Sequence, residues 1–597
     1  MAQWVLLDEG GEFDEMYKKA MKDTGFGEIF FTVLRNRGIK SENEMRSYLS
    51  PNIRSFSDAK KLKDIGKAMK ILKDSIEKRE KICIYGDYDV DGVCSTTILY
   101  KGLKYLGADV IYFIPDRKKD GYGLTVKNVE KIAEKECDLI FTCDNGISAI
   151  SEIRRIKELG MKCIVLDHHE PLFKKERNAK IDILPDADAI IDAKQEECEF
   201  AFNEMCAGGL SYIFMREFYD HMGVKLPNEA ELLVFAMIAT MSDVVPLKED
   251  NRIVARNGFK LIRNRVGLNK GLDTLIDMLE LKRAVIDEQI VGFRIAPCIN
   301  APGRLDSAMT AVELFVSDDE GEINEKASKL VSMNDERKNQ TETAKNRIMQ
   351  NIIENNYNND KVIVAEDDDA KEAVIGIAAG RIKDTFYRPT IVLTKGEECY
   401  KGSGRSIPGY NLFEELLGVK ELFIKFGGHY MAAGLSIEKE NIEILRKMLN
   451  ERCKLTDDEL TEKIYVDKVI KFSDISYKLV GELDTIQPYG EGNPKCLLQS
   501  NDISIENIRF VGKEKKCIQM RFSDRDGIKL QSIYFGGYEK VREELTKRYG
   551  EEKFEKIKNG TIYRIDERVD IVYTVGINSY NGRENLQLKI KDIKFKE

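Results

Sequence analysis

Short apolar segments alternate with amphipathic helical segments between Lys81 and about Ile191, and this alternation restricts the fold more than any other feature of the chain. The apolar segments are KICIYG, DVIYFIP, CDLIFTCDNG, KCIVLDHH and ADAIIDA. Helical segments such as TVKNVEKIAEK and AISEIRRIKELG lie between them. This pattern predicts an α/β fold, in which a doubly wound parallel sheet carries helices on both faces.

Polar residues follow four of these apolar segments, where the predicted strands end. They read GDYDVDG, DRKKDGYG, CDNG and LDHH. Since the carboxyl ends of parallel strands meet at one edge of the sheet, we expect these residues to be neighbours in space. Crowded carboxylates repel one another and resist loss of water, so such a cluster persists when cations neutralise it. The sequence therefore predicts a metal site at this edge.

The candidate ligands form a mixed oxygen and nitrogen set. They are Asp89, Asp91, Asp144, His168 and Asp243. Two divalent ions about 3.5 to 4 Å apart, bridged by a carboxylate, activate water and clamp a phosphoryl group. Each motif alone has a plainer interpretation, because D-x-D is often a helix cap and DNG a turn. Their convergence on one sheet edge favours the metal site.

The remaining chain divides into further regions, since 597 residues exceed what one hydrophobic core supports. We expect an N-terminal segment (1–50), the α/β domain (51–318), a connecting helix (319–357), a second α/β domain (358–452) and a small β-barrel (453–597). The connecting helix is polar and lacks proline, which predicts a solvated helix. The barrel is indicated by alternating segments such as CIQMRF and VDIVYTVGI.

Charge and cysteine content limit the function classes. The 94 basic and 103 acidic residues leave a net charge of −9, so a nucleic-acid partner would need a local basic groove. No apolar run approaches the roughly 20 residues that cross a bilayer. The N-terminus lacks the pattern of a signal peptide. Twelve cysteines without a C-x-x-C pair are typical of reduced thiols, so we expect a cytoplasmic protein without a membrane partner.

Eight motifs carry a family resemblance. DYDVDG, CDNG, LDHH and SDVVPL resemble, in this order, the successive motifs of the DHH phosphoesterase superfamily. INAPGRL, KGSGRS, FGGHYMAAG and PYGEGNP narrow the resemblance to the RecJ family of bacterial exonucleases that degrade single-stranded DNA from its 5′ end. The resemblance runs from about residue 50 to the C-terminus. It implies a DHH domain, a DHH-associated domain joined by the long helix, and a C-terminal OB-fold.

The resemblance also implies residue roles. The predicted ligands would hold two ions, Mn²⁺ or Mg²⁺, and Asp87 and Asp167 would act as a further ligand or support one. His169 would face the scissile phosphate, and Arg304 would stabilise charge on it with Asn300 beside it. The implied substrate contacts are Arg117, Ser403, Arg405, Gly427, Gly428 and His429. Candidate stacking residues in the barrel are Phe510, Tyr534, Tyr573 and Tyr580, with Arg509 nearby.

One segment departs from the family pattern. A Trp-His-x-Gly run is common before VIGI, but this chain has Ala370, Lys371 and Ala373 at the corresponding places. The departure concerns substrate positioning and leaves the metal ligands intact.

The implied function is a metal-dependent 5′ to 3′ exonuclease that degrades single-stranded DNA to 5′-mononucleotides in DNA repair and recombination. A RecQ-type helicase and a single-strand-binding protein are expected partners, and a monomer is the expected state. Two alternatives stay open. A phosphodiesterase of short oligonucleotides or cyclic dinucleotides would not need the barrel, and a non-catalytic replication scaffold would not need every ligand.

Overall fold

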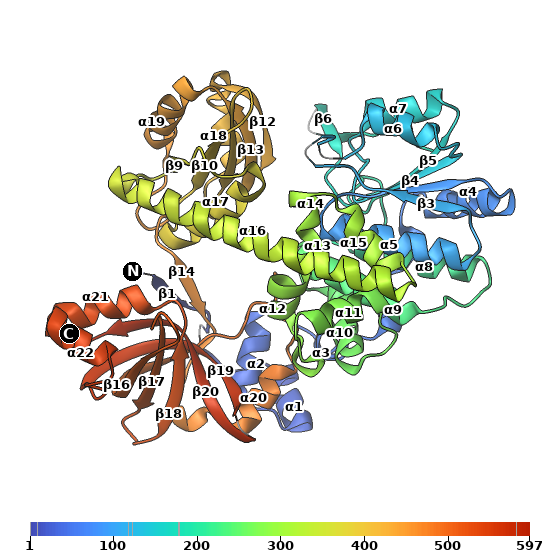
Figure 1. Cartoon of the computed structure of the whole chain (residues 1–597). Helices are drawn as coiled ribbons and strands as arrows, with labels where there is room; N and C mark the ends of the chain where they lie inside the picture. Colours follow the sequence, from blue (N-terminus) through green and yellow to red (C-terminus); the bar gives the residue numbers. More distant parts are fainter. Residues whose placement is uncertain are drawn as a thin grey trace. The chain divides into compact units, whose positions relative to one another are not determined.

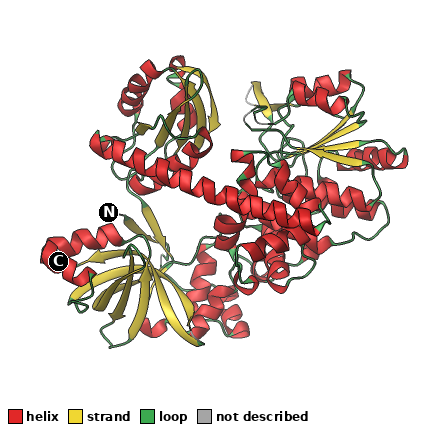
Figure 2. Cartoon of the chain, viewed as in Figure 1, coloured by secondary structure: helices red, strands yellow, loops and turns green. Residues whose placement is uncertain are grey.

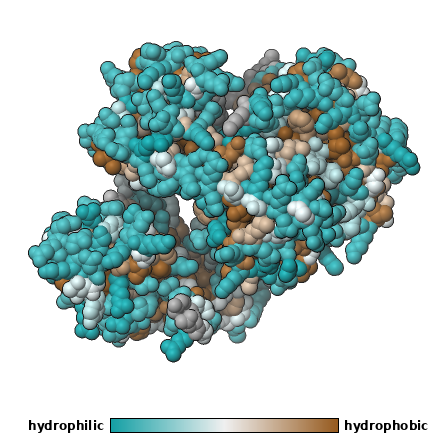
Figure 3. Space-filling model, in the orientation of Figure 1, coloured by the Kyte–Doolittle hydropathy of each residue, from teal (hydrophilic) through white to brown (hydrophobic). Residues whose placement is uncertain are grey.

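The computed structural model describes residues 2–8, 10–117, 119–121, 123–176, 179–580 and 582–596 (Figure 1). The chain forms two compact units: residues 52–461 make one, and residues 1–51 with 462–597 make the other. Hydrophilic side chains cover most of the visible face of each unit (Figure 3). Among the described helices, none is long and apolar enough to span a bilayer.

A five-stranded parallel sheet organises the first α/β domain. Its strands, in spatial order, are β3 (Val110–Phe113), β2 (Ile82–Tyr85), β4 (Leu139–Cys143), β5 (Lys162–Leu166) and β8 (Ala189–Ile191). This confirms the predicted doubly wound sheet, and Figure 2 shows helices on both of its sides. A two-stranded antiparallel ribbon, β6 (Leu172–Glu176) with β7 (Ala179–Ile183), follows β5 and was not predicted.

The two faces of the sheet belong to different hydrophobic clusters. Ile82 and Ile84 pack with helices on one side, whereas Cys83 and Tyr85 pack with helices on the other. The first group of helices includes α4 (Ile65–Glu77), α5 (Val90–Tyr105) and α8 (Ala207–His221). The second consists of α6 (Val126–Ala133) and α7 (Ile150–Glu158). Every residue of β2 is therefore buried, as expected for a parallel strand covered twice.

The rest of this domain is helical. It contains α9 (Glu229–Ser242), α10 (Glu249–Asn264), α11 (Lys270–Met278), α12 (Glu288–Ile290), a π-helical turn (Val291–Ile295), α13 (Ala296–Asn300), α14 (Pro302–Leu305) and α15 (Met309–Val316). Helix α9 packs against α5, α8 and α10, and its central residues are buried. This packing holds the end of α9 at the edge of the sheet.

Helix α16 (Glu320–Glu354) connects the two α/β domains. The expectation of a solvated helix is wrong for one face, which is buried along the helix. The buried residues are Ile323, Ala327, Leu330, Asn334, Arg337, Thr341, Ala344, Ile348 and Ile352. They recur every three or four positions and so form a single stripe. Because polar residues such as Asn334 and Arg337 belong to the stripe, the composition of the segment did not reveal a buried face.

The second α/β domain has a mixed sheet. Its strands, in spatial order, are β12 (Phe423–His429), β13 (Ala432–Ile437), β11 (Tyr400–Arg405), β10 (Thr390–Lys395) and β9 (Ile363–Glu366). Only β9 and β10 pair in parallel. Helix α17 (Glu372–Phe386) and the end of α16 pack on one face, and α18 (Leu412–Leu417) and α19 (Ile442–Arg452) pack on the other.

The other unit is built around a closed barrel. The strands of the ring are β16 (Leu498–Val511), β17 (Cys517–Ser523), β18 (Lys529–Tyr534), β20 (Arg583–Phe595) and β19 (Glu567–Tyr580), and β16 pairs with β19 to close it. The short strand β15 (Lys468–Val469) pairs with β16 outside the ring. Helices α21 (Tyr538–Tyr549) and α22 (Glu551–Lys558) follow β18. The barrel confirms the predicted fold of the C-terminal region.

The N-terminal residues share the core of this barrel unit. Strand β1 (Gln3–Leu6) pairs with β14 (Lys463–Val466). Helices α1 (Glu15–Thr24), α2 (Glu28–Asn36) and α3 (Glu42–Leu49) pack with α20 (Tyr477–Asp484) and the barrel in one hydrophobic cluster. The buried Arg37 lies 2.9 Å from the Asp467 carboxylate. The two ends of the chain therefore fold together.

Candidate active site

Acidic and histidine side chains gather at the carboxyl edge of the parallel sheet. Asp87 and Asp89 follow β2, Asp144 follows β4, and the segment 167–169 follows β5. Asp91 lies in the first turn of α5, and Asp243 is the last residue capping α9. Long-range packing of α9 thus adds a carboxylate that the sheet alone would not supply.

The geometry forms overlapping groups able to hold cations. Asp87, Asp89 and Asp144 form one group, and Asp91, His168 and Asp243 form another, each with ligand atoms within 4.8 Å of one another. His168 joins them, since its Nε2 lies 3.2 Å from Asp144 Oδ1 and 3.6 Å from Asp91 Oδ2. His168 Nδ1 lies 3.8 Å from Asp243 Oδ2. The sequence-predicted ligands are therefore neighbours in the structure.

Backbone amides orient Asp91. Its two carboxylate oxygens accept hydrogen bonds from the amides of Ala207, at 2.8 Å, and Gly208, at 2.7 Å. These amides begin α8, where the helix dipole favours a negative charge. A Cβ atom on Gly208 would lie 2.5 Å from the Cβ of Ala239 and 3.0 Å from Asp91 Oδ1, so this position requires glycine. Sequence reasoning missed both amide donors, because no motif marks them.

The loop after β2 combines two roles. Asp89 caps α5, since its Oδ1 accepts a hydrogen bond of 3.0 Å from the amide of Gly92. A Cβ atom on Gly92 would come within 2.4 Å of the Asp87 carbonyl oxygen, so only glycine allows this tight loop. The helix-cap interpretation of D-x-D is thus correct for Asp89. Its capping role holds the carboxylate in the acidic cluster.

The electrostatics of the cluster fit divalent cations. Burial and the charges of neighbouring aspartates raise the pKa of Asp91 to about 7 and that of Asp243 to about 8. The same causes raise the pKa values of Asp87 and Asp144 well above their usual range. Asp87 Oδ1 is buried without a hydrogen-bond partner in the described part of the chain. A cation would supply the partner that this oxygen lacks and offset the repulsion.

His168 suits metal binding as a neutral imidazole. Burial, together with the charge of His169, lowers the pKa of His168 to about 3. Neutral imidazole is the form that binds a metal. The donor set of carboxylate oxygens and one imidazole suits Mn²⁺ and Mg²⁺ better than a soft metal.

Asp167 holds His169 at the cluster, where a ring nitrogen of His169 lies within 4.8 Å of ligand atoms of Asp144 and His168. The Nδ1 of His169 lies 2.7 Å from Asp167 Oδ1, and Asp167 Oδ2 accepts a hydrogen bond from the amide of Ile147. Burial alone would lower the pKa of His169, but the hydrogen bond and charge of Asp167 raise it to about 9. The His169 side chain is 43% exposed. It is therefore a protonated, accessible donor at neutral pH.

Adjacent residues of a strand point to opposite sides, but the His168 and His169 side chains do not. Their ring centroids lie 4.4 Å apart with a tilt of 52°. The reason is that β5 ends at Leu166, so side-chain alternation no longer applies at residues 168 and 169.

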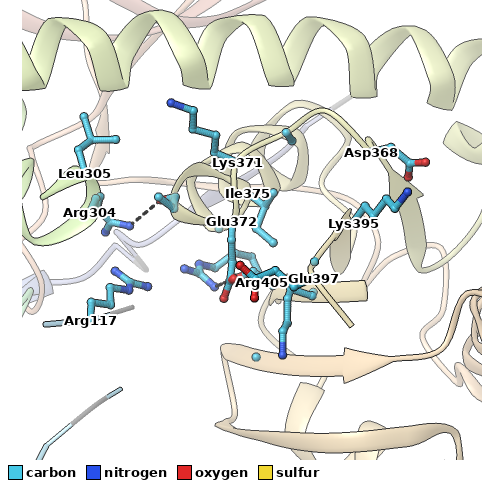
Figure 4. A pocket seen from close by; sticks show the side chains of 18 of the residues that line it. Arg117, Arg304, Leu305, Asp368, Lys371, Glu372, Ile375, Lys395, Glu397 and Arg405 are labelled. Carbon is cyan, nitrogen blue, oxygen red and sulfur yellow. Dashed lines mark hydrogen bonds between the residues drawn. The ribbon is translucent and has the colours of Figure 1, made fainter. Parts of the chain in front are cut away.

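A pocket of about 1180 Å³ lies next to the loop that carries Asp87 and Asp89, since Arg117 in its wall lies 5.2 Å from the ring centroid of Tyr88 (Figure 4). Six basic and five acidic side chains line it. Arg117, Arg304, Ser403 and Arg405 line it, together with the start of α17. Arg304 donates a hydrogen bond of 3.2 Å to the Ala373 carbonyl. Arg405 donates to Ser403 Oγ at 3.1 Å and to the Gly404 carbonyl at 2.7 Å. None of the three arginines forms an ion pair with a carboxylate among the residues that the structure describes.

Crowded guanidinium groups favour an anion in this pocket. Burial and the charges of Arg117, Arg337 and Arg405 lower the pKa of Arg304 to about 10. Burial and the charge of Arg117 also lower the pKa of Arg405. Guanidinium groups bind phosphate through paired hydrogen bonds, and an anion would relieve their mutual repulsion. The pocket therefore fits a phosphate.

Gly376 is a pocket residue that sequence reasoning missed. A Cβ atom there would lie 2.9 Å from both Ser403 Oγ and Arg405 Nη2. This glycine of the VIGI segment lets α17 approach the two side chains. Ala370, Lys371 and Ala373, which replace the common Trp-His-x-Gly run, also line the pocket. The backbone carbonyl of Ala373, which needs no particular side chain, positions Arg304.

Comparisons with known proteins agree with this arrangement. Family models match at residues 81–239 (DHH family, N-terminal domain), 359–455 (DHHA1 domain) and 466–592 (RecJ OB domain). The single-stranded-DNA-specific exonuclease RecJ of Bacillus subtilis is 34% identical over 575 residues, which cover 95% of this chain and 68% of that protein. The RecJ of Salmonella typhimurium is 30% identical over 94% of each chain.

The chain belongs to the RecJ family. The crystal structure of RecJ from Thermus thermophilus in complex with Mn²⁺ has the same fold, with a TM-score of 0.80 and 23% identity over all of this chain and 80% of that one. A crystal structure of exonuclease RecJ bound to manganese matches with a TM-score of 0.57 and 28% identity, over 67% of this chain and 96% of that one.

Other residues implied by the RecJ resemblance do not line the pocket of Arg304 and Arg405. Asn300 ends α13 and is half-buried. Gly427, Gly428 and His429 lie on β12, an exposed edge strand. A Cβ atom on Gly428 would come within 2.4 Å of the Ala432 carbonyl oxygen, so the hairpin itself requires this glycine. The structure therefore does not bring these four residues to the pocket.

The three aromatic candidates of the RecJ-type barrel whose side chains the structure describes do not form a stacking surface. Phe510, Tyr534 and Tyr573 are buried in the core of the barrel unit. The Tyr573 hydroxyl lies 2.7 Å from Ser500 Oγ. The side chain of Tyr580 lies outside the described residues. Alternation along a strand does not reveal which of its two faces points into a barrel, and these residues occupy the inner one.

Proposed function

We propose that this chain is a metal-dependent exonuclease that degrades single-stranded DNA from its 5′ end to 5′-mononucleotides, in DNA repair and recombination. The observation that supports it is an acidic cation site next to a pocket of arginines without carboxylate partners among the described residues. The substrate is inferred from the relatives, which are named as single-stranded-DNA-specific exonucleases.

The acidic cluster would hold two divalent ions, Mn²⁺ or Mg²⁺. The proposed ligands are Asp87, Asp89, Asp91, Asp144, His168 and Asp243. Such ions lower the pKa of bound water and polarise the phosphate. The relative bound to manganese, at 28% identity, supports this choice of metal.

The chain's own side chains would bind and orient the strand. Protonated His169, held by Asp167, would donate a hydrogen bond to a non-bridging oxygen of the scissile phosphate. Arg304 would donate to the same group as negative charge increases there. Arg117, Ser403 and Arg405 would bind the 5′ phosphate, which explains attack at an end rather than within the strand. We propose Asn300, Gly427, Gly428 and His429 as further substrate contacts outside this pocket.

Further proposals concern the setting of the enzyme. We propose that it acts in the cytoplasm as a monomer, with a RecQ-type helicase supplying single strands and a single-strand-binding protein presenting them. We propose functional domains at 51–318 and 358–452 for catalysis and at 453–597 for strand binding, with 1–50 as the N-terminal segment and 319–357 as the connection.

Digestion of labelled strands tests the activity. A 3′-labelled single-stranded DNA, with and without a 5′ phosphate, is incubated with Mn²⁺ beside its duplex and a single-stranded RNA. We expect progressive shortening of the single-stranded DNA, faster with the 5′ phosphate. Asp144→Ala should abolish shortening, whereas Asp186→Ala, at an exposed position, should not.

Two outcomes would favour the alternatives. Cleavage of dinucleotides without cleavage of long strands would indicate a phosphodiesterase of short oligonucleotides. Strand binding without cleavage in any divalent metal would indicate a non-catalytic scaffold.

A further inference from the structure

The ribbon β6–β7 begins three residues after His169 and has two different faces. Cross-strand pairing places Leu172 opposite Ile183 and Phe173 opposite Asp182. Because paired residues share a face, Leu172 and Ile183 lie on one side and Phe173 lies on the other. Lys180 shares the second side, with its Nζ 5.3 Å from the centroid of the Phe173 ring.

The second side is tied to the loop that follows β8. Asp182 Oδ2 accepts a hydrogen bond of 2.8 Å from the amide of Glu196. Lys194, in the same loop, lies 3.7 Å from Glu170, and Lys180 lies 3.5 Å from that carboxylate. Glu170 directly follows His169 in the chain. These contacts join the residue that follows His169 to the aromatic face of the ribbon.

Charge and exposure make this group suitable for a nucleic-acid strand. Phe173 is 50% exposed, and Lys180 lies over its ring. Glu170 is 68% exposed and shared between two lysines at long distances, so these ion pairs are weak. A phosphate could replace Glu170 at little cost.

The ribbon and the arginine pocket adjoin different residues of the acidic cluster and its histidines. Arg117 lies 5.2 Å from the ring centroid of Tyr88, beside Asp87, whereas the ribbon continues from His169. A strand whose 5′ phosphate occupies the arginine pocket would place its next nucleotides beyond the acidic cluster. The ribbon, which follows His169 in the chain, offers basic and aromatic side chains for them.

We propose that Phe173, Lys180 and Lys194 bind the substrate strand on the 3′ side of the scissile phosphate, from the second nucleotide after it onward. Phe173 stacks against a base, and the two ammonium groups bind successive phosphates in place of Glu170. This inference rests on the proposed exonuclease function and extends it, because it assigns the part of the strand that follows the scissile bond. Base stacking and phosphate contacts of this type tolerate any sequence.

Substrates of two lengths distinguish an effect on this surface from an effect on the catalytic centre. We compare kcat/KM in Mn²⁺ for a 5′-phosphorylated 16-mer and a 5′-phosphorylated dinucleotide, which has no nucleotides beyond the second residue. Phe173→Ala should lower the value for the 16-mer about 5- to 100-fold, in line with about 1–3 kcal/mol per stacked base, and leave the dinucleotide nearly unchanged. Leu172→Ala, on the opposite face of the same ribbon, is the matched control and should change neither.

Salt dependence tests the lysines. Each phosphate contact contributes about 0.7 to the slope of log affinity against log salt for a single strand. Lys180→Ala and Lys194→Ala should each reduce the slope for the 16-mer by about that amount, as measured by fluorescence anisotropy with a 3′-labelled strand. Leu172→Ala should leave the slope unchanged.

The outcomes are distinguishable. Three results would overturn the assignment while the exonuclease activity stands. The first is an equal loss of kcat/KM on the dinucleotide and the 16-mer, and the second is an unchanged kcat/KM for the 16-mer with all three variants. The third is an effect of Leu172→Ala as large as that of Phe173→Ala. If the unmodified protein cleaves neither substrate, the proposed function fails, and the anisotropy slopes still decide whether the ribbon binds the strand.

Discussion

At the scale of single residues, the carboxylates of the acidic cluster repel one another, and a bound cation would reduce this repulsion. Asp91 and Asp243 have folded-state pKa values of about 7 and about 8, above the ordinary value of 3.8. The folded, metal-free protein therefore holds protons that the unfolded chain releases. Its stability from these groups is full below about pH 4 and is lost as the pH rises toward 8.

This titration predicts how the metal effect depends on pH. The increase in Tm on adding Mn²⁺ should be small at pH 5.5 and grow up to pH 8, because protons and metal compete for the same carboxylates. Differential scanning fluorimetry with Mn²⁺ or with EDTA measures it. Asp144→Asn should raise the Tm in EDTA and reduce the Mn²⁺ effect, and asparagine suits the left-handed backbone at φ 64°. A metal effect that stays constant over this range would contradict the explanation.

The arginine pocket gives a second prediction at this scale. Arg405→Ala removes a partly buried guanidinium whose charge-assisted contacts are worth about 1.5–3 kcal/mol. We expect kcat/KM for a 5′-phosphorylated strand to fall about 10- to 100-fold, with a much smaller change for a 5′-hydroxyl strand. Lys447→Ala, at an exposed lysine of α19, serves as the control. A similar loss on both strands would argue against a 5′-phosphate site.

At the scale of elements, the long helix α16 offers a matched pair of isoleucines. Ile348 is fully buried between α16 and the second sheet, whereas Ile353 is 59% exposed on the same helix. Ile348→Ala should lower the free energy of unfolding by about 2–5 kcal/mol. Ile353→Ala should change it by about 0.5 kcal/mol or less.

Urea denaturation of both variants checks this prediction. Because both variants replace isoleucine by alanine on the same helix, the effect of helix propensity is the same in both. The difference between their free energies of unfolding therefore reports the burial of the side chain. Equal midpoints would show that the helix is solvated on both faces, as the composition had suggested.

At the scale of the whole molecule, the N-terminal and C-terminal segments form one unit. The buried ion pair between Arg37 and Asp467 joins them, and Arg37 also donates to the Pro494 carbonyl at 2.9 Å. Removing one member leaves a buried charge, which costs about 3–5 kcal/mol. Arg37→Ala should therefore destabilise the unit of residues 1–51 and 462–597 and leave residues 52–461 unaffected.

Calorimetry of the full chain resolves this prediction. We expect two transitions, with only one shifted to lower temperature by Arg37→Ala. Arg46→Ala, at an exposed position on α3, should shift neither. A shift of both transitions would mean that the two units unfold together.

The sequence by itself determined the parallel sheet, the barrel and the set of acidic and histidine residues, because hydrophobic periodicity and strand-end motifs are local. It also indicated Arg304 and Arg405 through the family resemblance. It could not show that Asp167 pairs with His169, or that the amides of Ala207 and Gly208 hold Asp91. Those contacts join segments distant in the chain or lie beyond the end of a strand.

Tertiary structure alone decided the remaining features. The buried face of α16 contains polar residues, so its stripe appears only when neighbouring elements pack on it. Phe510 and Tyr573 occupy the barrel core because closure of the barrel sets which face is inside. The ribbon β6–β7 and the shared core of the chain ends also depend on long-range packing. Local patterns specify elements, whereas the burial of each side chain follows from the partners that those elements meet.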